Sequence, residues 1–256
     1  MRPPTDFADR HGTGSFRRRI RLVTESPGLV LGAVEDEMHH YRVRLAHDGE
    51  VVTGVEGEPV RVPWTTCPDA GARLTELVGV TLTRRPQHVV ASLDPRLHCT
   101  HWLDLAVLAV IHAATDRHRR QFDIEVPDWF QPPFGASLLV DGAPLLRWEV
   151  GRDLMLESPE PFAGRRLIGG FSRWAESTLD DEMVEAAFVL HRGTWLSAAR
   201  RIDLEAADDA TEGQLVPAVC HSGQPDVMPV ALRSRGSLRD YGRSPDPLLT
   251  APGDPV

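Results

Sequence analysis

The stretch that decides the fold is MHHYRVRLAHDGEVVTGVEGEPVRV, residues 38–62, in which apolar and polar residues alternate on both sides of Asp48-Gly49. Alternation with period two is typical of strands with one buried face, and an Asp-Gly pair between two such runs predicts a hairpin. In the first arm, His39 shares a face with the apolar residues and His40 shares the opposite face. We therefore expect His39 to point inward and His40 to point outward.

Further runs on both sides of this hairpin add strands to the same antiparallel sheet. RRRIRLV and GLVLGAV precede it, and FDIEV, SLLVDGAPLLRWEVG and DLMLES follow after residue 121. These runs are short and rich in branched residues, and the second group contains an Asp-Gly pair at residues 141–142 that predicts another turn. We interpret the arginines at residues 17–19 as the solvated start of a strand.

Three segments have helical signals. TTCPDAGARLTELVG, residues 65–79, predicts a short helix with a capping box between Thr66 and Asp69. CTHWLDLAVLAVIHAAT, residues 99–115, predicts a central buried helix, and residues 170–192 predict one or two helices that end before Gly193. Strands, helices, strands and helices in this order favour an α+β fold, in which an antiparallel sheet packs against a central helix with additional short helices.

The 256 residues are enough for one core without disulfide bonds. Residues 1–15 lack periodicity and predict a loose N-terminal arm, residues 16–241 predict a single α+β domain, and residues 242–256 predict a disordered tail because proline, glycine and charge dominate there.

Composition excludes several kinds of chemistry. All 28 basic residues are arginine, and the chain has neither lysine nor asparagine, so Schiff-base lysines, P-loop lysines and Cys-His-Asn triads are ruled out. A net charge of −9 argues against nucleic acid or anionic membranes as partners. Three cysteines with no secretory leader before them predict a cytoplasmic protein with free thiols, and no nucleotide motif suggests a cofactor.

Two cysteines lie where helices are expected to start. The unpaired N–H groups and the dipole of a helix start can lower a thiol pKa, so Cys67 and Cys99 are candidates for chemistry. His101 and Asp104 are three residues apart on one helix face, and the carboxylate could hold the imidazole in one tautomer. The candidate catalytic residues are His39, His40, Cys67, Cys99, His101 and Asp104.

Two plainer interpretations stay open at this point. Free cysteines are often buried and inert, and His101 with Asp104 could be a local helix pair that contributes little. Cysteine and histidine are also ligands that zinc prefers, although His39, Cys67, Cys99 and His101 lack the CxxC or HExxH spacing of known zinc motifs.

Three motifs, EDEMHHYRVRLAHDG, PWTTCPDA and CTHWLDLAVLA, occur in this order. Their combination resembles a family of bacterial proteins designated as a domain of unknown function, numbered twenty-eight eighty-nine, over residues 17–241. The resemblance implies a bacterial protein without an assigned nucleotide or metal motif, of a kind found beside catabolic genes for aromatic or other apolar compounds. The resemblance is carried by Glu35, Asp36, His39, His40, Cys67, Pro68, Cys99, Thr100, His101 and Asp104.

These observations together favour a cofactor-independent lyase or isomerase that acts on a small, apolar, aromatic substrate of catabolism. His39 or His101 would be the general base, Asp104 would orient it, and N–H groups at the helix starts would stabilise anionic charge. A non-catalytic small-molecule binding module and a zinc-binding protein are the alternatives. The expected partner is a small molecule, with no nucleic acid or membrane, and a homo-oligomer is left open.

Overall fold

The computed structural model describes residues 14–128, 131–213 and 219–256, and within them the strands form one antiparallel sheet of eight. The α+β expectation is therefore confirmed. The order across the sheet is β4-β3-β2-β1-β5-β6-β7-β8. The strands are β1 (Ser15–Ser26), β2 (Leu29–Glu35), β3 (His40–His47), β4 (Val52–Arg61), β5 (Arg119–Pro127), β6 (Phe134–Val140), β7 (Ala143–Val150) and β8 (Leu156–Ser158).

The sheet consists of two four-stranded meanders joined where β1 pairs with β5. In this seam Ile20 lies opposite Phe122, and each meander otherwise pairs strands that follow one another along the chain. Both Asp-Gly turns form as predicted: Gly49 and Gly142 have φ of 100° and 82°, left-handed values that favour glycine. One hairpin of each meander, β3–β4 and β6–β7, thus follows directly from a hairpin signal in the sequence.

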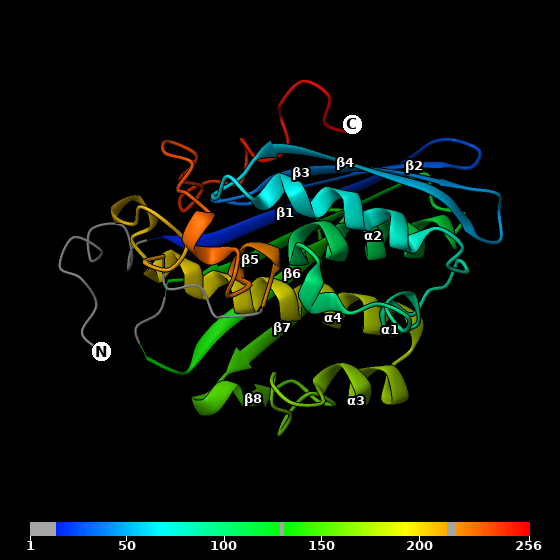
Figure 1. Cartoon of the computed structure of the whole chain (residues 1–256). Coiled ribbons are helices and arrows are strands. Elements are labelled where there is room, and N and C mark those ends of the chain that lie inside the picture. Colours follow the sequence, from blue (N-terminus) through cyan, green and yellow to red (C-terminus); the bar gives the residue numbers. More distant parts are fainter. Residues whose placement is uncertain (1–13, 129–130, 214–218) are drawn as a thin grey trace.

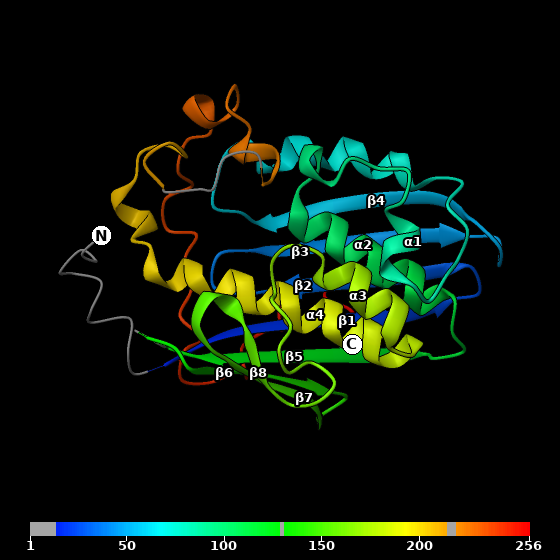
Figure 2. The same cartoon turned by 90° about the horizontal axis from the view of Figure 1, so that it is seen from below.

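The helices cover one face of this sheet (Figures 1 and 2). Helix α2 contacts β1, β2, β3 and β4, and α4 contacts β5, β6, β7 and β1. Nearly every residue of α2 is buried, as expected for a central helix. The helices are α1 (Pro86–Val89), α2 (Thr100–Ala113), α3 (Phe171–Thr178) and α4 (Asp181–Ser197), and the 3-10 segments are η2 (Cys67–Leu77), η3 (Pro95–Leu97), η4 (Arg152–Leu154), η5 (Ala198–Arg201), η6 (Leu204–Ala206), η7 (His221–Gly223) and η8 (Met228–Val230).

Two helix predictions need correction. The segment after Thr66 is a 3-10 helix, and the predicted capping box is absent there because the Thr66 side chain makes no capping hydrogen bond. Helix α4 runs through Gly193 to Ser197 instead of ending before it. A Cβ at position 193 would lie 2.5 Å from Cγ2 of Ile124, so this glycine lets α4 approach β5 closely and does not end the helix.

The prediction of a disordered tail is also wrong. Residues 242–256 lie against the sheet on the side opposite α2 and α4 (Figure 1). Leu248 is 1 % exposed, and the carboxylate of Asp254 accepts hydrogen bonds from Nε2 of His40 at 2.7 Å and Nε of Arg42 at 2.9 Å. The order of this segment comes from contacts with distant strands, which no local pattern reveals.

The predicted N-terminal arm falls mainly outside the described residues, and of its expected range Ser15 already belongs to β1. In the part of the chain that the structure describes, no helix combines the length and apolar character needed to cross a membrane.

Candidate functional site

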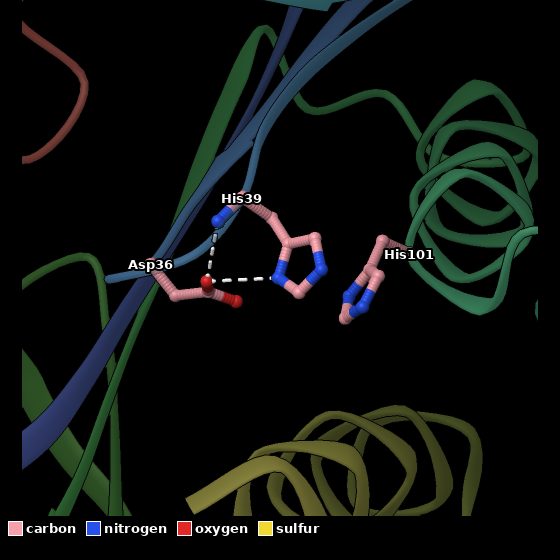
Figure 3. Close-up of side chains that lie close together, drawn as sticks. All are labelled: Asp36, His39 and His101. Atoms are coloured by element: carbon pink, nitrogen blue, oxygen red, sulfur yellow. Dashed lines mark hydrogen bonds and ion pairs between the residues drawn. The ribbon is translucent and has the colours of Figure 1, made fainter. Parts of the chain in front are cut away.

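The turn between β2 and β3 holds a buried carboxylate. Asp36 is fully buried, and its Oδ1 accepts hydrogen bonds from the backbone N–H groups of Met38 at 2.9 Å and His39 at 2.8 Å. The same oxygen lies 3.1 Å from Nδ1 of His39 (Figure 3). An aspartate that bonds the backbone two and three residues ahead is common in turns. Here the turn also fixes the ring of His39.

Arg18 reaches the same carboxylate from β1. It shares the core-facing side of β1 with Phe16 and Ile20, forms an ion pair with Asp36, and is 1 % exposed in its side chain. Its Nη1 also lies 3.2 Å from Nδ1 of His101. The interpretation of residues 17–19 as a solvated strand start is therefore wrong for the middle arginine, because the alternation of the strand turns it inward.

The third group comes from the start of α2. Cys99 precedes the first helical residue, and His101 in the first turn points toward His39 (Figure 3). The two imidazole rings stack with their centroids 3.6 Å apart and their planes at 30°. A strand turn, a core-facing strand residue and a helix start thus assemble Asp36, Arg18 and the two histidines into one buried cluster.

Burial and charge set the protonation states in this cluster. The pKa of Asp36 is held well below its ordinary value: burial alone would raise it, but His39 and Arg18 stabilise the carboxylate. Burial lowers the pKa of His39, although Asp36 opposes the change. Burial lowers the pKa of His101 well below its ordinary value, and the charge of Arg18 lowers it further. At neutral pH, Asp36 is therefore charged and both histidines are neutral.

The hydrogen-bond partners also assign the tautomers. A carboxylate only accepts, so Nδ1 of His39 carries the proton and its Nε2 keeps a lone pair. A guanidinium only donates, so Nδ1 of His101 accepts from Arg18 and its Nε2 carries the proton. Two adjacent neutral imidazoles thus differ in role: His39 offers a base, and His101 offers a hydrogen-bond donor.

Both histidines line a cavity of about 290 Å³. Its wall is mainly apolar and comes from the two helix starts, from β3 and the turn before it, and from the end of α4 and the chain after it, with Trp64 and Trp195 among the aromatic residues. Among the described residues of this wall there is no aspartate, glutamate or arginine. A largely apolar, concave space with a few polar groups is typical of small-molecule sites.

Four of the six predicted site residues meet at this cavity. His39, Cys67, Cys99 and His101 all line it. The expectation that the helix starts lower the pKa values of the two thiols is wrong. Burial raises the pKa of Cys99 to about 12 and also raises the pKa of Cys67, so both thiols keep their protons at neutral pH.

The other two predicted residues lie elsewhere. His40 points away from His39, as expected, but the tail buries it to 3 % exposure against Asp254, and it does not line the cavity. Asp104 pairs with Nε of Arg192 at 3.1 Å, and no hydrogen bond joins it to His101. The predicted orienting role of Asp104 toward His101 is therefore wrong, because a separate ion pair holds that carboxylate.

The described residues include one cluster of three metal-ligand side chains, Asp36, His39 and His101, whose donor atoms lie within 4.8 Å of one another. The thiols suggested as zinc ligands by the sequence are not part of it. Two histidines and a carboxylate suit several divalent metals, but Arg18 already bonds both Asp36 and His101. Its positive charge opposes a metal ion at the same donors.

Residues 25–114 match the model of a family described as Protein of unknown function (DUF2889). The match runs from the end of β1 to the end of α2 and includes Asp36, His39 and His101. The resemblance found in the sequence is thus confirmed for this part of the chain. No curated protein matches the chain.

Proposed function

We propose that this protein is a cofactor-independent enzyme, a lyase or isomerase, that acts by acid–base chemistry on a small, mainly apolar, aromatic compound of catabolism. The observation that carries this proposal is the pair of neutral histidines at the cavity wall, whose tautomers are set in opposite senses by Asp36 and Arg18. A general base must be neutral at the working pH and must be oriented by a second group, and His39 meets both requirements.

The two histidines take different parts in this proposal. Nε2 of His39 accepts a proton from a carbon of the substrate, and Asp36 stabilises the imidazolium that forms, as a buried carboxylate does in other histidine catalysts. Nε2–H of His101 donates to the negative charge that develops on the substrate. Arg18 takes part by holding Asp36 and His101, so it is a positioning residue.

The cavity restricts the substrate. Ionised side chains are missing from its described wall, so a charged substrate would lose its hydration without gaining a counter-charge. Trp64, Trp195 and Tyr41 provide flat apolar surfaces that suit an aromatic ring. The protonated thiols of Cys67 and Cys99 complete the wall, and we assign them no nucleophilic role.

The cellular context belongs to the proposal as well. Cys67, Cys99 and Cys220 are all free thiols, which favours a reducing, cytoplasmic environment. The partner in this proposal is a small molecule, and it needs neither nucleic acid nor a membrane. The proposal holds for a monomer and for a homo-oligomer alike.

Hydrogen exchange on carbon acids tests the proposed chemistry. A panel of small aromatic ketones and nitroalkanes is first screened by thermal shift, since a ligand at about 100 times its dissociation constant adds nearly 3 kcal/mol to stability. Compounds that bind are then incubated in D2O, and deuterium incorporation is followed by NMR. We expect exchange with the wild type and a loss of about 100-fold or more in His39→Gln, because the glutamine cannot take up the proton.

His112→Gln is a matched control, since it removes another buried histidine, at the opposite end of α2 and outside the cavity wall. We expect exchange at the wild-type rate in this variant. If ligands bind but no compound of the panel exchanges with the wild type, the protein is a binding module and the enzyme proposal fails.

A metal centre at Asp36, His39 and His101 is the second candidate, because their donor atoms lie close together. The charge of Arg18 leads us to expect far less than one zinc per chain in protein purified without added metal, as measured by elemental analysis. A chelator should leave the melting temperature unchanged, since a structural metal contributes directly to stability. Stoichiometric metal bound at these residues would replace the acid–base proposal.

A further inference from the structure

The cavity contains a polar group that nothing in the described part of the chain satisfies. The side chain of Tyr41, on β3, is fully buried and lines the cavity, and its hydroxyl has no hydrogen-bond partner there. Buried hydroxyl groups almost always have a partner, because losing water without one is costly. An unpaired hydroxyl in the wall of a cavity therefore points to a partner on the ligand.

The closest polar neighbours of this hydroxyl do not replace such a partner. The thiols of Cys99 and Cys67 lie near enough to raise the pKa of Tyr41 together with burial, but sulfur is a weak acceptor and no hydrogen bond of normal geometry forms. The pKa of Tyr41 lies well above its ordinary value, so the phenol keeps its proton. Tyr41 is thus a hydrogen-bond donor whose nearest acceptors are the two weak sulfur atoms.

Tyr41 also lies beside the proposed base. It is two residues after His39 along the chain, so both side chains project from the same face. Its ring centroid is 5.9 Å from that of His39 and 6.1 Å from that of His101, with the three rings roughly parallel. An oxygen bound to Tyr41 would place the adjoining atoms of a small ligand near the two imidazoles.

We propose that the substrate is a neutral carbonyl compound whose oxygen accepts a hydrogen bond from the Tyr41 hydroxyl while His39 removes a proton from the adjacent carbon. This inference rests on the proposed function and names its substrate class. Tyr41 is then a catalytic residue, because it touches the oxygen on which charge develops.

The proton and electron balance needs no other reactant. The C–H bond next to the carbonyl breaks, its proton moves to Nε2 of His39, and its electron pair forms the C=C bond of an enolate whose negative charge rests on the oxygen. Tyr41 and Nε2–H of His101 donate to that oxygen. Where a further C=C bond is conjugated with this enolate, the imidazolium returns the proton to the far carbon of the dienolate, which gives an isomer. Otherwise the enolate expels a leaving group from the next carbon, and that group takes the proton from the imidazolium, which gives a lyase product and restores neutral His39.

Binding of two matched probes tests the carbonyl inference without requiring turnover. Acetophenone and ethylbenzene have nearly the same shape and differ at the carbonyl group, and both are small enough for a cavity of about 290 Å³. Their dissociation constants are measured by ligand-observed NMR with the wild type and with Tyr41→Phe. We expect about tenfold or stronger preference for acetophenone in the wild type and a preference below about twofold in Tyr41→Phe.

The same variant separates a catalytic from a structural role. Because the hydroxyl has no partner in the free protein, Tyr41→Phe should melt at the wild-type temperature or above it. His112→Gln, which lies outside the cavity wall and leaves the hydroxyl, should keep the preference for acetophenone. 1-Phenylethanol, which has a hydroxyl in place of the carbonyl, should bind more weakly than acetophenone.

Several results would overturn the inference: the same preference in the wild type and in Tyr41→Phe, a melting temperature several degrees lower in that variant, stronger binding of 1-phenylethanol, or no binding of acetophenone at millimolar concentration. If deuterium exchange then occurs on nitroalkanes and depends on His39, the acid–base function stands and the carbonyl assignment alone fails.

Discussion

Arg18 carries a full charge, although the alternation of β1 places its side chain in the core. Its ion pair with Asp36 is completely buried, and it also fixes the tautomer of His101. Burying both charges costs several kcal/mol, which the pair offsets only while both partners are present. The stability of the protein and the order of the site thus depend on the same guanidinium.

Removing the charge of Arg18 should therefore destabilise the protein strongly. We expect Arg18→Gln to lower the free energy of unfolding by about 3–5 kcal/mol, because Asp36 is left as a buried charge without its partner. Its neighbour Arg17 pairs with Glu125 on the more exposed face, so Arg17→Gln should cost at most about 1 kcal/mol. Urea denaturation of the two variants measures both values, and equal small effects would contradict the buried pair.

The site shows where single-sequence reasoning works and where it stops. His39 was placed inward by the alternation of its strand, and Cys99 and His101 by the start of a helix. Asp36 entered only through the family resemblance, although its position three residues before His39 in a turn is a usable signal. Arg18 was missed because a run of arginines looks solvated, whereas the strand period turns one of them inward.

At the scale of the secondary-structure elements, α2 carries a second buried histidine at its other end. Nε2 of His112 lies 3.2 Å from the hydroxyl oxygen of Thr24 on β1, and burial lowers the pKa of His112 to about 4. In the unfolded chain its pKa is about 6.5. Between these values the unfolded chain binds the proton and the folded one does not, so acidification favours unfolding.

The contribution of His112 to stability is fully present above about pH 6.5 and is lost as the pH falls toward 4. In this window the unfolding free energy of the wild type should fall more steeply with acidification than that of His112→Gln, by up to about 1.4 kcal/mol per pH unit. Denaturant titrations at several pH values measure the slope. His88→Gln, at an exposed position, is the control, and parallel slopes for all three proteins would refute the assignment.

Local patterns were sufficient for the regular elements. The two Asp-Gly turns and α2 lie where the sequence placed them, because turn chemistry and periodicity act within a few residues. The end of α4 could not be predicted, since Gly193 usually signals a helix end and its packing against Ile124 is a tertiary contact. At this position, close packing against β5 outweighs the low helix propensity of glycine.

At the scale of the whole molecule, the C-terminal tail covers the sheet face that no helix covers. Its backbone also bonds to charged side chains of the sheet: the carbonyl of Leu248 accepts from Nη1 of Arg19 at 3.2 Å, and the N–H of Leu249 donates to Glu35. The sequence could not reveal these bonds, because their partners are more than 200 residues apart along the chain. Composition alone describes such a segment as disordered.

A single truncation distinguishes the two descriptions of the tail. Leu248→Ala should lower the free energy of unfolding by about 2 kcal/mol or more if the side chain is buried, and by almost nothing if the tail is disordered. The loss is limited by the free energy with which the tail is docked. Thr250→Ala, two residues later and exposed, should have little effect. Equal stability of both variants in urea would support the disordered tail.

The seam between β1 and β5 has a consequence for how the protein is made. Its partners are about a hundred residues apart, so this pairing closes a long loop, whereas the first meander needs only neighbouring hairpins. On the ribosome, Arg18, Asp36, His39 and His101 all emerge before β5 does. The part of the cavity wall that follows α4 is synthesised nearly a hundred residues after His101. A nascent chain can thus bring its ionisable groups together early, but its pocket gains the remaining wall only after α4 has been synthesised.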